Sequence, residues 1–168
     1  MKRLPALIAC CILGFSLLTQ AGGRPGQVAI ASAHPAATVA GLETLAAGGN
    51  AFDAAVAVSA ALAVTEPYGS GLGGGGFFLL RKAGDKPAYH FLDAREKAPQ
   101  AATPDMYREQ PARSLDGALA AAIPGLPAAL ADLASRYGRL PLAASLAPAI
   151  RLAEDGFPVD RVYRERAD

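Results

Sequence analysis

The chain has 168 residues, of which 52% are hydrophobic and 18% charged, and its formal net charge is +1. This composition predicts a packed interior and excludes an intrinsically disordered chain. The near-zero charge gives no reason to expect nucleic acid or an acidic membrane surface as a partner.

The first 21 residues have the layout of a secretory signal peptide. Residues 1–3 carry two basic side chains, residues 4–18 are almost wholly apolar, and Ala21 is a small residue at the expected cleavage site. The apolar run is shorter than the roughly 20 residues of a membrane-spanning helix, so a retained anchor is the second interpretation. A lipoprotein cleaved before Cys10 is the third. We expect export to the periplasm or the exterior, with no stable membrane span after cleavage. Cleavage would remove both cysteines, Cys10 and Cys11, with the signal peptide, so no thiol nucleophile is expected in the mature chain.

The rest of the chain predicts a mixed order of elements. These are a flexible leader (22–27), a short buried strand (28–33), two helices (36–47 and 51–65), a hairpin (77–81 and 88–92) and two further helices (126–137 and 141–154). The second helix is apolar nearly all round, which places it in an interior. Asp53 is expected to cap that helix or to complement the charge of its first turn.

A glycine-rich loop follows the second helix, and its residues 71–76 match the G-x-G-x-x-G pattern. A dinucleotide site needs a strand before this loop and a helix after it, whereas here a helix enters and a strand leaves. A nucleotide-binding domain is therefore disfavoured. Two interpretations stay open: the glycines permit a tight bend or close packing, or they let a substrate approach backbone N–H groups.

Several blocks in order resemble the γ-glutamyltransferase family. They are Ser32-Ala33-His34-Pro35, Gly48-Gly49-Asn50-Ala51-Phe52-Asp53-Ala54-Ala55-Val56, Glu66-Pro67 with Ser70-Gly71-Leu72-Gly73-Gly74-Gly75-Gly76-Phe77, Leu92-Asp93-Ala94-Arg95-Glu96, Tyr137-Gly138-Arg139-Leu140-Pro141 and residues 146–159. A single block would be weak evidence, but an ordered set over nearly all of residues 28–159 is specific.

The resemblance implies an α+β fold, the αββα sandwich of the N-terminal-nucleophile hydrolases, incomplete in this chain. In that family a precursor cuts itself into two subunits, and the newly exposed threonine attacks the γ-glutamyl amide of glutathione, without a cofactor. Residues 28–168 would form the N-terminal portion of the large subunit. The partners would be glutathione or another γ-glutamyl compound, the remaining C-terminal portion and the small subunit. No catalytic residue is expected within this chain, which alone should be inactive.

Arg95 matches the family's arginine that holds the α-carboxylate of the γ-glutamyl group, and Glu96 is expected to orient it. Arginine offers two parallel donors to a carboxylate, and a strand end can aim it. The alternative is a surface ion pair of Arg95 with Asp93 or Glu96. His34 and His90 are the only histidines, and no metal site is expected. A non-catalytic secreted module that binds carboxylates through Arg95 remains the alternative function.

Overall fold

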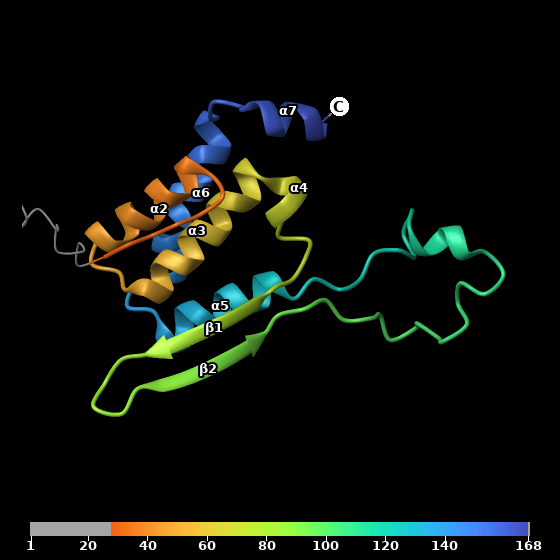
Figure 1. Cartoon of the computed structure of the whole chain (residues 1–168), viewed down its shortest axis with the longest axis horizontal. Coiled ribbons are helices and arrows are strands. Elements are labelled where there is room, and N and C mark those ends of the chain that lie inside the picture. Colours follow the sequence, from red (N-terminus) through yellow and green to blue (C-terminus); the bar gives the residue numbers. More distant parts are fainter. Residues whose placement is uncertain (1–27, 168) are drawn as a thin grey trace, which may run out of the picture. The chain divides into compact units, whose positions relative to one another are not determined.

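The computed structural model describes residues 28–167, so the predicted signal peptide and leader lie outside the described residues. The described residues from 31 onward belong to one compact unit. Its elements are α2 (Pro35–Ala46), α3 (Ala51–Thr65), α4 (Pro67–Ser70), β1 (Phe77–Lys82), β2 (Ala88–Asp93), the 3-10 helix η1 (Pro111–Ser114), α5 (Leu126–Tyr137), α6 (Leu142–Asp155) and α7 (Arg161–Ala167) (Figure 1). None of the described helices is both long and apolar enough to cross a lipid bilayer.

The start of α2 is set by the sequence His34-Pro35. The imidazole Nδ1 of His34 accepts a hydrogen bond from the backbone N–H of Ala36 at 3.1 Å, and Pro35 occupies the first helical turn. The helix ends before Gly48, whose φ of 95° is the left-handed conformation common after a helix C-terminus. Both ends of this helix therefore follow from local residues.

Helix α3 begins with a reciprocal capping box. Oδ1 of Asn50 accepts from the backbone N–H of Asp53 at 3.1 Å, while Oδ2 of Asp53 accepts from the N–H of Asn50 at 2.8 Å. The predicted capping role of Asp53 is confirmed, and the structure adds to it. The fully buried Asp53 carboxylate also accepts from the N–H groups of Arg139 at 2.9 Å and Leu140 at 3.3 Å. This one side chain joins the start of α3 to the turn between α5 and α6.

Helix α3 lies among the other helices, as its apolar sequence predicts, and it contacts α2, α5 and α6. Two groups of buried side chains make the core. One contains Val56, Leu80, Leu126, Leu130, Leu133 and Ala134, and the other contains Ala37, Ala40, Ala60, Ala61 and Ala149. The second group is built from alanines, which let helix backbones approach closely.

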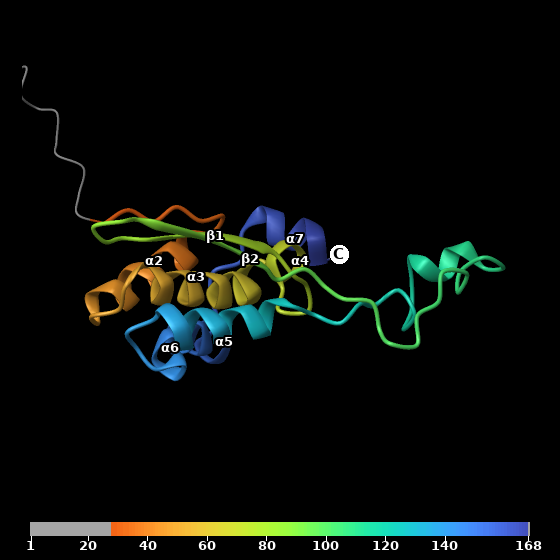
Figure 2. The ribbon, with the colours of Figure 1, turned by 90° about the horizontal axis from the view of Figure 1, so that it is seen from below.

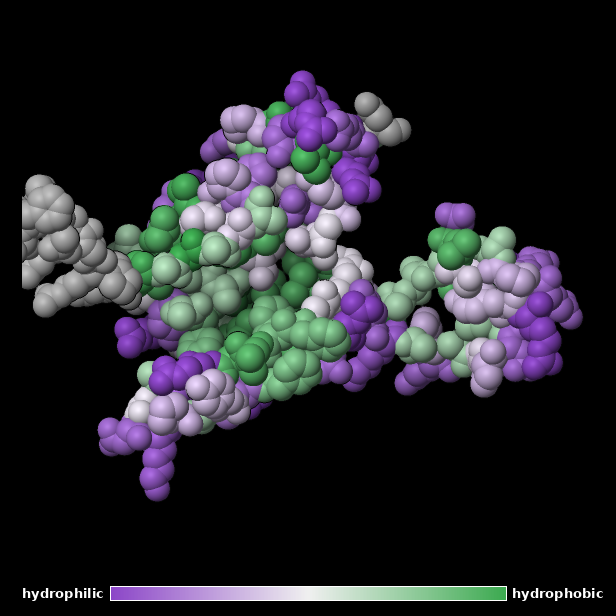
Figure 3. Space-filling model, in the orientation of Figure 1, coloured by the Kyte–Doolittle hydropathy of each residue, from purple (hydrophilic) through white to green (hydrophobic). Residues whose placement is uncertain are grey.

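Strands β1 and β2 form the predicted antiparallel hairpin, with Leu79 paired to Phe91 and Leu80 to His90. Because side chains alternate across a strand, one face of the hairpin carries Leu80, which joins the core, and the other carries Leu79. Helices α2, α3, α5 and α6 lie on one side of the hairpin (Figure 2). We call the opposite side the outer hairpin face; its exposed hydrophobic residues are Phe77, Leu79, Tyr89 and Phe91. Figure 3 shows hydrophobic residues gathered over this part of the surface.

One predicted element is wrong. Residues 28–33 were expected to form a buried strand, but they form neither a helix nor a strand, and Val28 and Ala29 are exposed. A strand needs a neighbouring strand to satisfy its N–H and C=O groups. Within the described residues no strand pairs with this segment, because the two strands there, β1 and β2, pair with each other.

Candidate functional site

The candidate site begins just past the end of β2. Beyond the last strand residue, Asp93, the ladder continues for one more pair of hydrogen bonds. The N–H of Ala94 donates to the carbonyl of Gly76 at 3.0 Å, and the N–H of Gly76 donates to the carbonyl of Ala94 at 3.2 Å. Arg95 is therefore the first residue beyond the hydrogen-bonded pairs of the hairpin. The sequence prediction that a strand end presents this arginine agrees with the structure.

Of the three nitrogen atoms of the Arg95 guanidinium, only Nε forms an ion pair among the described residues. Its Nε lies 3.2 Å from Oε2 of Glu96, and its Cζ lies 6.0 Å from the centre of the Phe77 ring on the outer hairpin face. The Arg95 side chain is 58% exposed. An arginine has five N–H donors, four of them on the two Nη atoms. Within the described residues no hydrogen bond or ion pair engages either Nη, so these donors can meet a ligand carboxylate.

Glu96 is the less exposed residue of this ion pair. Its side chain is 23% exposed, and its buried Oε2 has no hydrogen-bond partner among the described residues. The carboxylate lies against the glycine-rich loop: a β-carbon placed on Gly74 would be 3.5 Å from Oε1, and one placed on Gly75 would be 2.9 Å from Oε2. Because Glu96 is confined there, its contact with Nε restricts where Arg95 can point.

The surface ion pair weighed as the alternative for Arg95 is thus present, with Glu96 rather than Asp93 as the partner. Asp93 has a different role, since its Oδ1 accepts from the backbone N–H of Arg95 at 2.9 Å. An ion pair this exposed contributes about 0–1 kcal/mol to stability. The contact involves Nε only, so it leaves the four N–H donors of the two Nη atoms for other partners.

The glycine-rich loop has the order of elements that disfavours a dinucleotide site. The short helix α4 precedes it and β1 follows it, so no helix N-terminus faces the loop at its exit. The loop instead packs on residues 94–96, as the distances from Gly74 and Gly75 show. Close packing, one of the two open interpretations, is what these residues do within the described chain.

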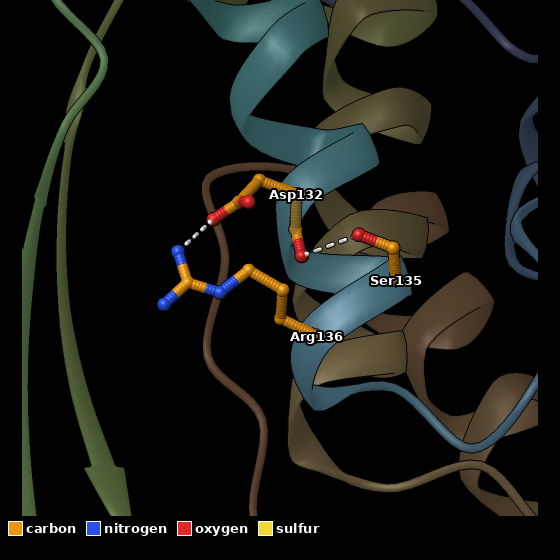
Figure 4. A network of polar contacts seen from close by, with 3 residues as sticks. All are labelled: Asp132, Ser135 and Arg136. Carbon is orange, nitrogen blue, oxygen red and sulfur yellow. Dashed lines mark hydrogen bonds and ion pairs between the residues drawn. The ribbon is translucent and has the colours of Figure 1, made fainter.

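A surface pocket of about 440 Å³ borders the site on the side of α5. Arg95, Lys97, Ile123, Gly125 and Asp132 contribute to its lining. The Asp132 carboxylate is already bound within α5, where Oδ2 lies 3.3 Å from Nη1 of Arg136, and its backbone carbonyl accepts from the Ser135 hydroxyl at 3.2 Å (Figure 4). The charged residues that line this pocket are Asp93, Arg95, Lys97 and Asp132, so the two acids balance the two bases.

The two histidines lie apart from each other in different roles. His34 caps α2, and the His90 ring lies 5.8 Å from the ring of Tyr137. Across residues 28–167 no cluster of three or more His, Cys, Asp or Glu side chains is arranged to hold a metal ion.

Comparison with known proteins places these features in a family. Residues 37–168 match the family model described as gamma-glutamyltranspeptidase. The chain is 40% identical over 149 residues to a glutathione hydrolase proenzyme of Bacillus subtilis (strain 168) and 44% identical over 143 residues to one of Escherichia coli (strain K12). These matches cover 85% and 82% of this chain, but only 25% and 24% of the relatives. The chain therefore spans about a quarter of the length of the curated relatives it matches.

Solved structures give the same result. The gamma-glutamyltranspeptidase of Helicobacter pylori superposes with a TM-score of 0.78 at 38% identity, over 84% of this chain and 42% of that one. A cephalosporin acylase from Bacillus halodurans superposes with a TM-score of 0.71 at 37% identity, over 86% of this chain and 30% of that one. The mixed helix and sheet arrangement is thus the one found in these enzymes.

Proposed function

The chain belongs to the γ-glutamyltranspeptidase family, and we propose that the protein carrying this sequence cleaves the γ-glutamyl amide of glutathione. The γ-glutamyl group would pass to water or to an amino acid. Relatives named glutathione hydrolase proenzymes, at 40% and 44% identity, support this reaction class.

The observation that carries the proposal is the presentation of Arg95. Its side chain is more than half exposed, its Nε forms an ion pair with Glu96, and it follows the end of β2 with its guanidinium near the Phe77 ring. The α-carboxylate of a γ-glutamyl group would accept two parallel hydrogen bonds from the Nη atoms. In a water-excluded site, such charged hydrogen bonds contribute roughly 1.5–3 kcal/mol. Glu96 would act on the substrate only through Arg95, by limiting the directions in which the guanidinium points.

The rest of the reaction would use groups outside these 168 residues. We propose that a threonine at a new N-terminus, with its own α-amino group as base, attacks the γ-carbonyl, because a threonine hydroxyl is a weak nucleophile without activation. The outer hairpin face would then pack against a second sheet, which would complete an αββα sandwich. Residues 1–168 alone would be inactive, and the protein would act in the periplasm or outside the cell.

The test compares Arg95→Lys with wild type in the complete gene product that contains this sequence. We expect KM for γ-glutamyl-p-nitroanilide to rise roughly tenfold to a hundredfold, because an ammonium group cannot make the paired contact. The measurement is initial-rate release of p-nitroaniline. Arg108→Lys is the matched control, since Arg108 is exposed and pairs with Asp105 away from the site.

Two results would contradict the proposal. Unchanged KM in Arg95→Lys would remove this residue from the substrate site. A folded, wild-type gene product that binds γ-glutamyl compounds but releases no p-nitroaniline would instead indicate the non-catalytic carboxylate-binding module.

A further inference from the structure

Two glycines from different parts of the chain contact the peptide that carries Arg95. A β-carbon placed on Gly125 would lie 2.7 Å from the backbone oxygen of Arg95, and closer still to the carbonyl oxygen of Ala94. A β-carbon placed on Gly75 would lie 2.9 Å from Cα of Arg95 and would also overlap the Ala94 carbonyl oxygen. Real β-carbons keep at least 3.0 Å from such atoms. At Gly125 all the atoms that a side chain would displace belong to backbone, and at Gly75 two of the three do, the third being Oε2 of Glu96.

Hydrogen bonds fix the three backbone segments that meet here. In addition to the Ala94–Gly76 pair, the N–H of Leu126 donates to the carbonyl of Gly74 at 3.2 Å. Lys97 and Ile123 exchange two bonds, of 3.0 and 2.9 Å, just beyond Arg95. The Ala94 residue between these bonds is 4% exposed. A movement of the peptide before Arg95 would therefore strain or break these hydrogen bonds.

We propose that Gly75 and Gly125 are positioning residues that set the location of the Arg95 guanidinium, and that their lack of a side chain is a requirement of substrate binding. This inference rests on the proposed role of Arg95. A methyl group at Gly125 forces the Ala94–Arg95 peptide to move by several tenths of an ångström. A methyl group at Gly75 presses in addition on the Glu96 carboxylate, which holds Nε of Arg95. Displacements of about 1 Å in a positioned group can cost roughly a hundredfold in rate.

The experiment measures kcat and KM for γ-glutamyl-p-nitroanilide in the complete gene product carrying Gly125→Ala or Gly75→Ala. We expect KM to rise roughly tenfold to a hundredfold in each, with a much smaller change in kcat. The matched control is Gly69→Ala in α4, because the nearest atom to its added methyl group is the flexible Glu66 carboxylate at 3.9 Å. Gly69→Ala should leave both constants within about twofold of wild type.

A double-mutant cycle separates positioning from a general structural role. If the glycines act through Arg95, then Gly125→Ala changes KM by less than about twofold once Arg95→Ala is present. Equal effects of Gly125→Ala in both backgrounds, or no effect on KM in wild type, would overturn the inference. If one glycine variant does not fold, the cycle is decided by the other. If neither folds while Gly69→Ala does, the glycines serve the fold and the inference is wrong. A KM unaffected by Arg95→Ala alone would instead reject the proposed function.

Discussion

Charged residues placed on the outer hairpin face should convert residues 28–168 from an associating chain into a monomer. The four hydrophobic residues of this face, Phe77, Leu79, Tyr89 and Phe91, are 61%, 76%, 66% and 65% exposed. Large apolar side chains have areas of about 150–250 Å², so the face presents roughly 500 Å². At about 25 cal/mol per Å², covering it would be worth about 12 kcal/mol. A patch of this size is typical of a surface that meets another surface.

The substitution we suggest is the pair Leu79→Lys with Phe91→Glu. These residues are directly opposed in the hairpin register, so the new charges attract each other and preserve strand pairing. We expect wild-type residues 28–168 to elute as oligomers and to bind the dye ANS, and the double variant to elute as a monomer with an unchanged far-ultraviolet circular dichroism spectrum. Size-exclusion chromatography with light scattering measures the mass.

Leu115→Lys is the control, because Leu115 is 78% exposed but lies outside this face. It should leave the wild-type oligomers in place. The reasoning is refuted if wild-type residues 28–168 are monomeric, bind no ANS and melt cooperatively, since the exposed face would then have no tendency to be covered.

Two further predictions concern stability of the complete gene product. Asp53→Ala leaves three part-buried backbone N–H groups without their acceptor, so we expect a loss of about 2–4 kcal/mol by urea denaturation. Asp53→Asn should lose about half as much, because the amide oxygen can still serve two of them; equal losses would contradict the assignment. Gly48→Ala should cost about 1 kcal/mol, since the φ of 95° is strained for alanine although no atom lies within 4 Å. A neutral or stabilising result there would contradict the conformational argument.

The helices were predictable where local residues mark both ends. The predicted bounds of 51–65 and 126–137 match α3 and α5 residue for residue, because Asn50 caps the first and Gly138 stops the second. The three short helices α4, η1 and α7, of four, four and seven residues, were missed, since so few residues show no helical periodicity. The strand expected at 28–33 failed for a different reason, because a strand depends on a partner that local sequence does not identify.

At the candidate site, the resemblance to the family indicated Arg95 and its neighbour Glu96. The local features alone, a strand end followed by an arginine with acids beside it, fit a surface ion pair at least as well. The sequence did not indicate Gly125. This glycine is 30 residues from Arg95 in the chain, and only the folded structure brings it against the Ala94 carbonyl. In the sequence Gly125 stands between Pro124 and the first residue of α5. A side chain is normally tolerated at such a position, so nothing in the sequence indicated that glycine is required there.

The hydrogen bonds by which Asp53 joins the start of α3 to the turn after α5 have a consequence for folding. Two of the three backbone donors to Asp53, on Arg139 and Leu140, are 86 and 87 residues further along the chain. A chain that extends only as far as the hairpin can form the local Asn50–Asp53 cap, but its carboxylate would lose hydrating water on burial without gaining the donors of residues 139 and 140. Burial of that carboxylate becomes favourable only when the turn after α5 is present to donate to it. Docking of α3 into its final position therefore depends on the chain up to Leu140 and not on α3 alone.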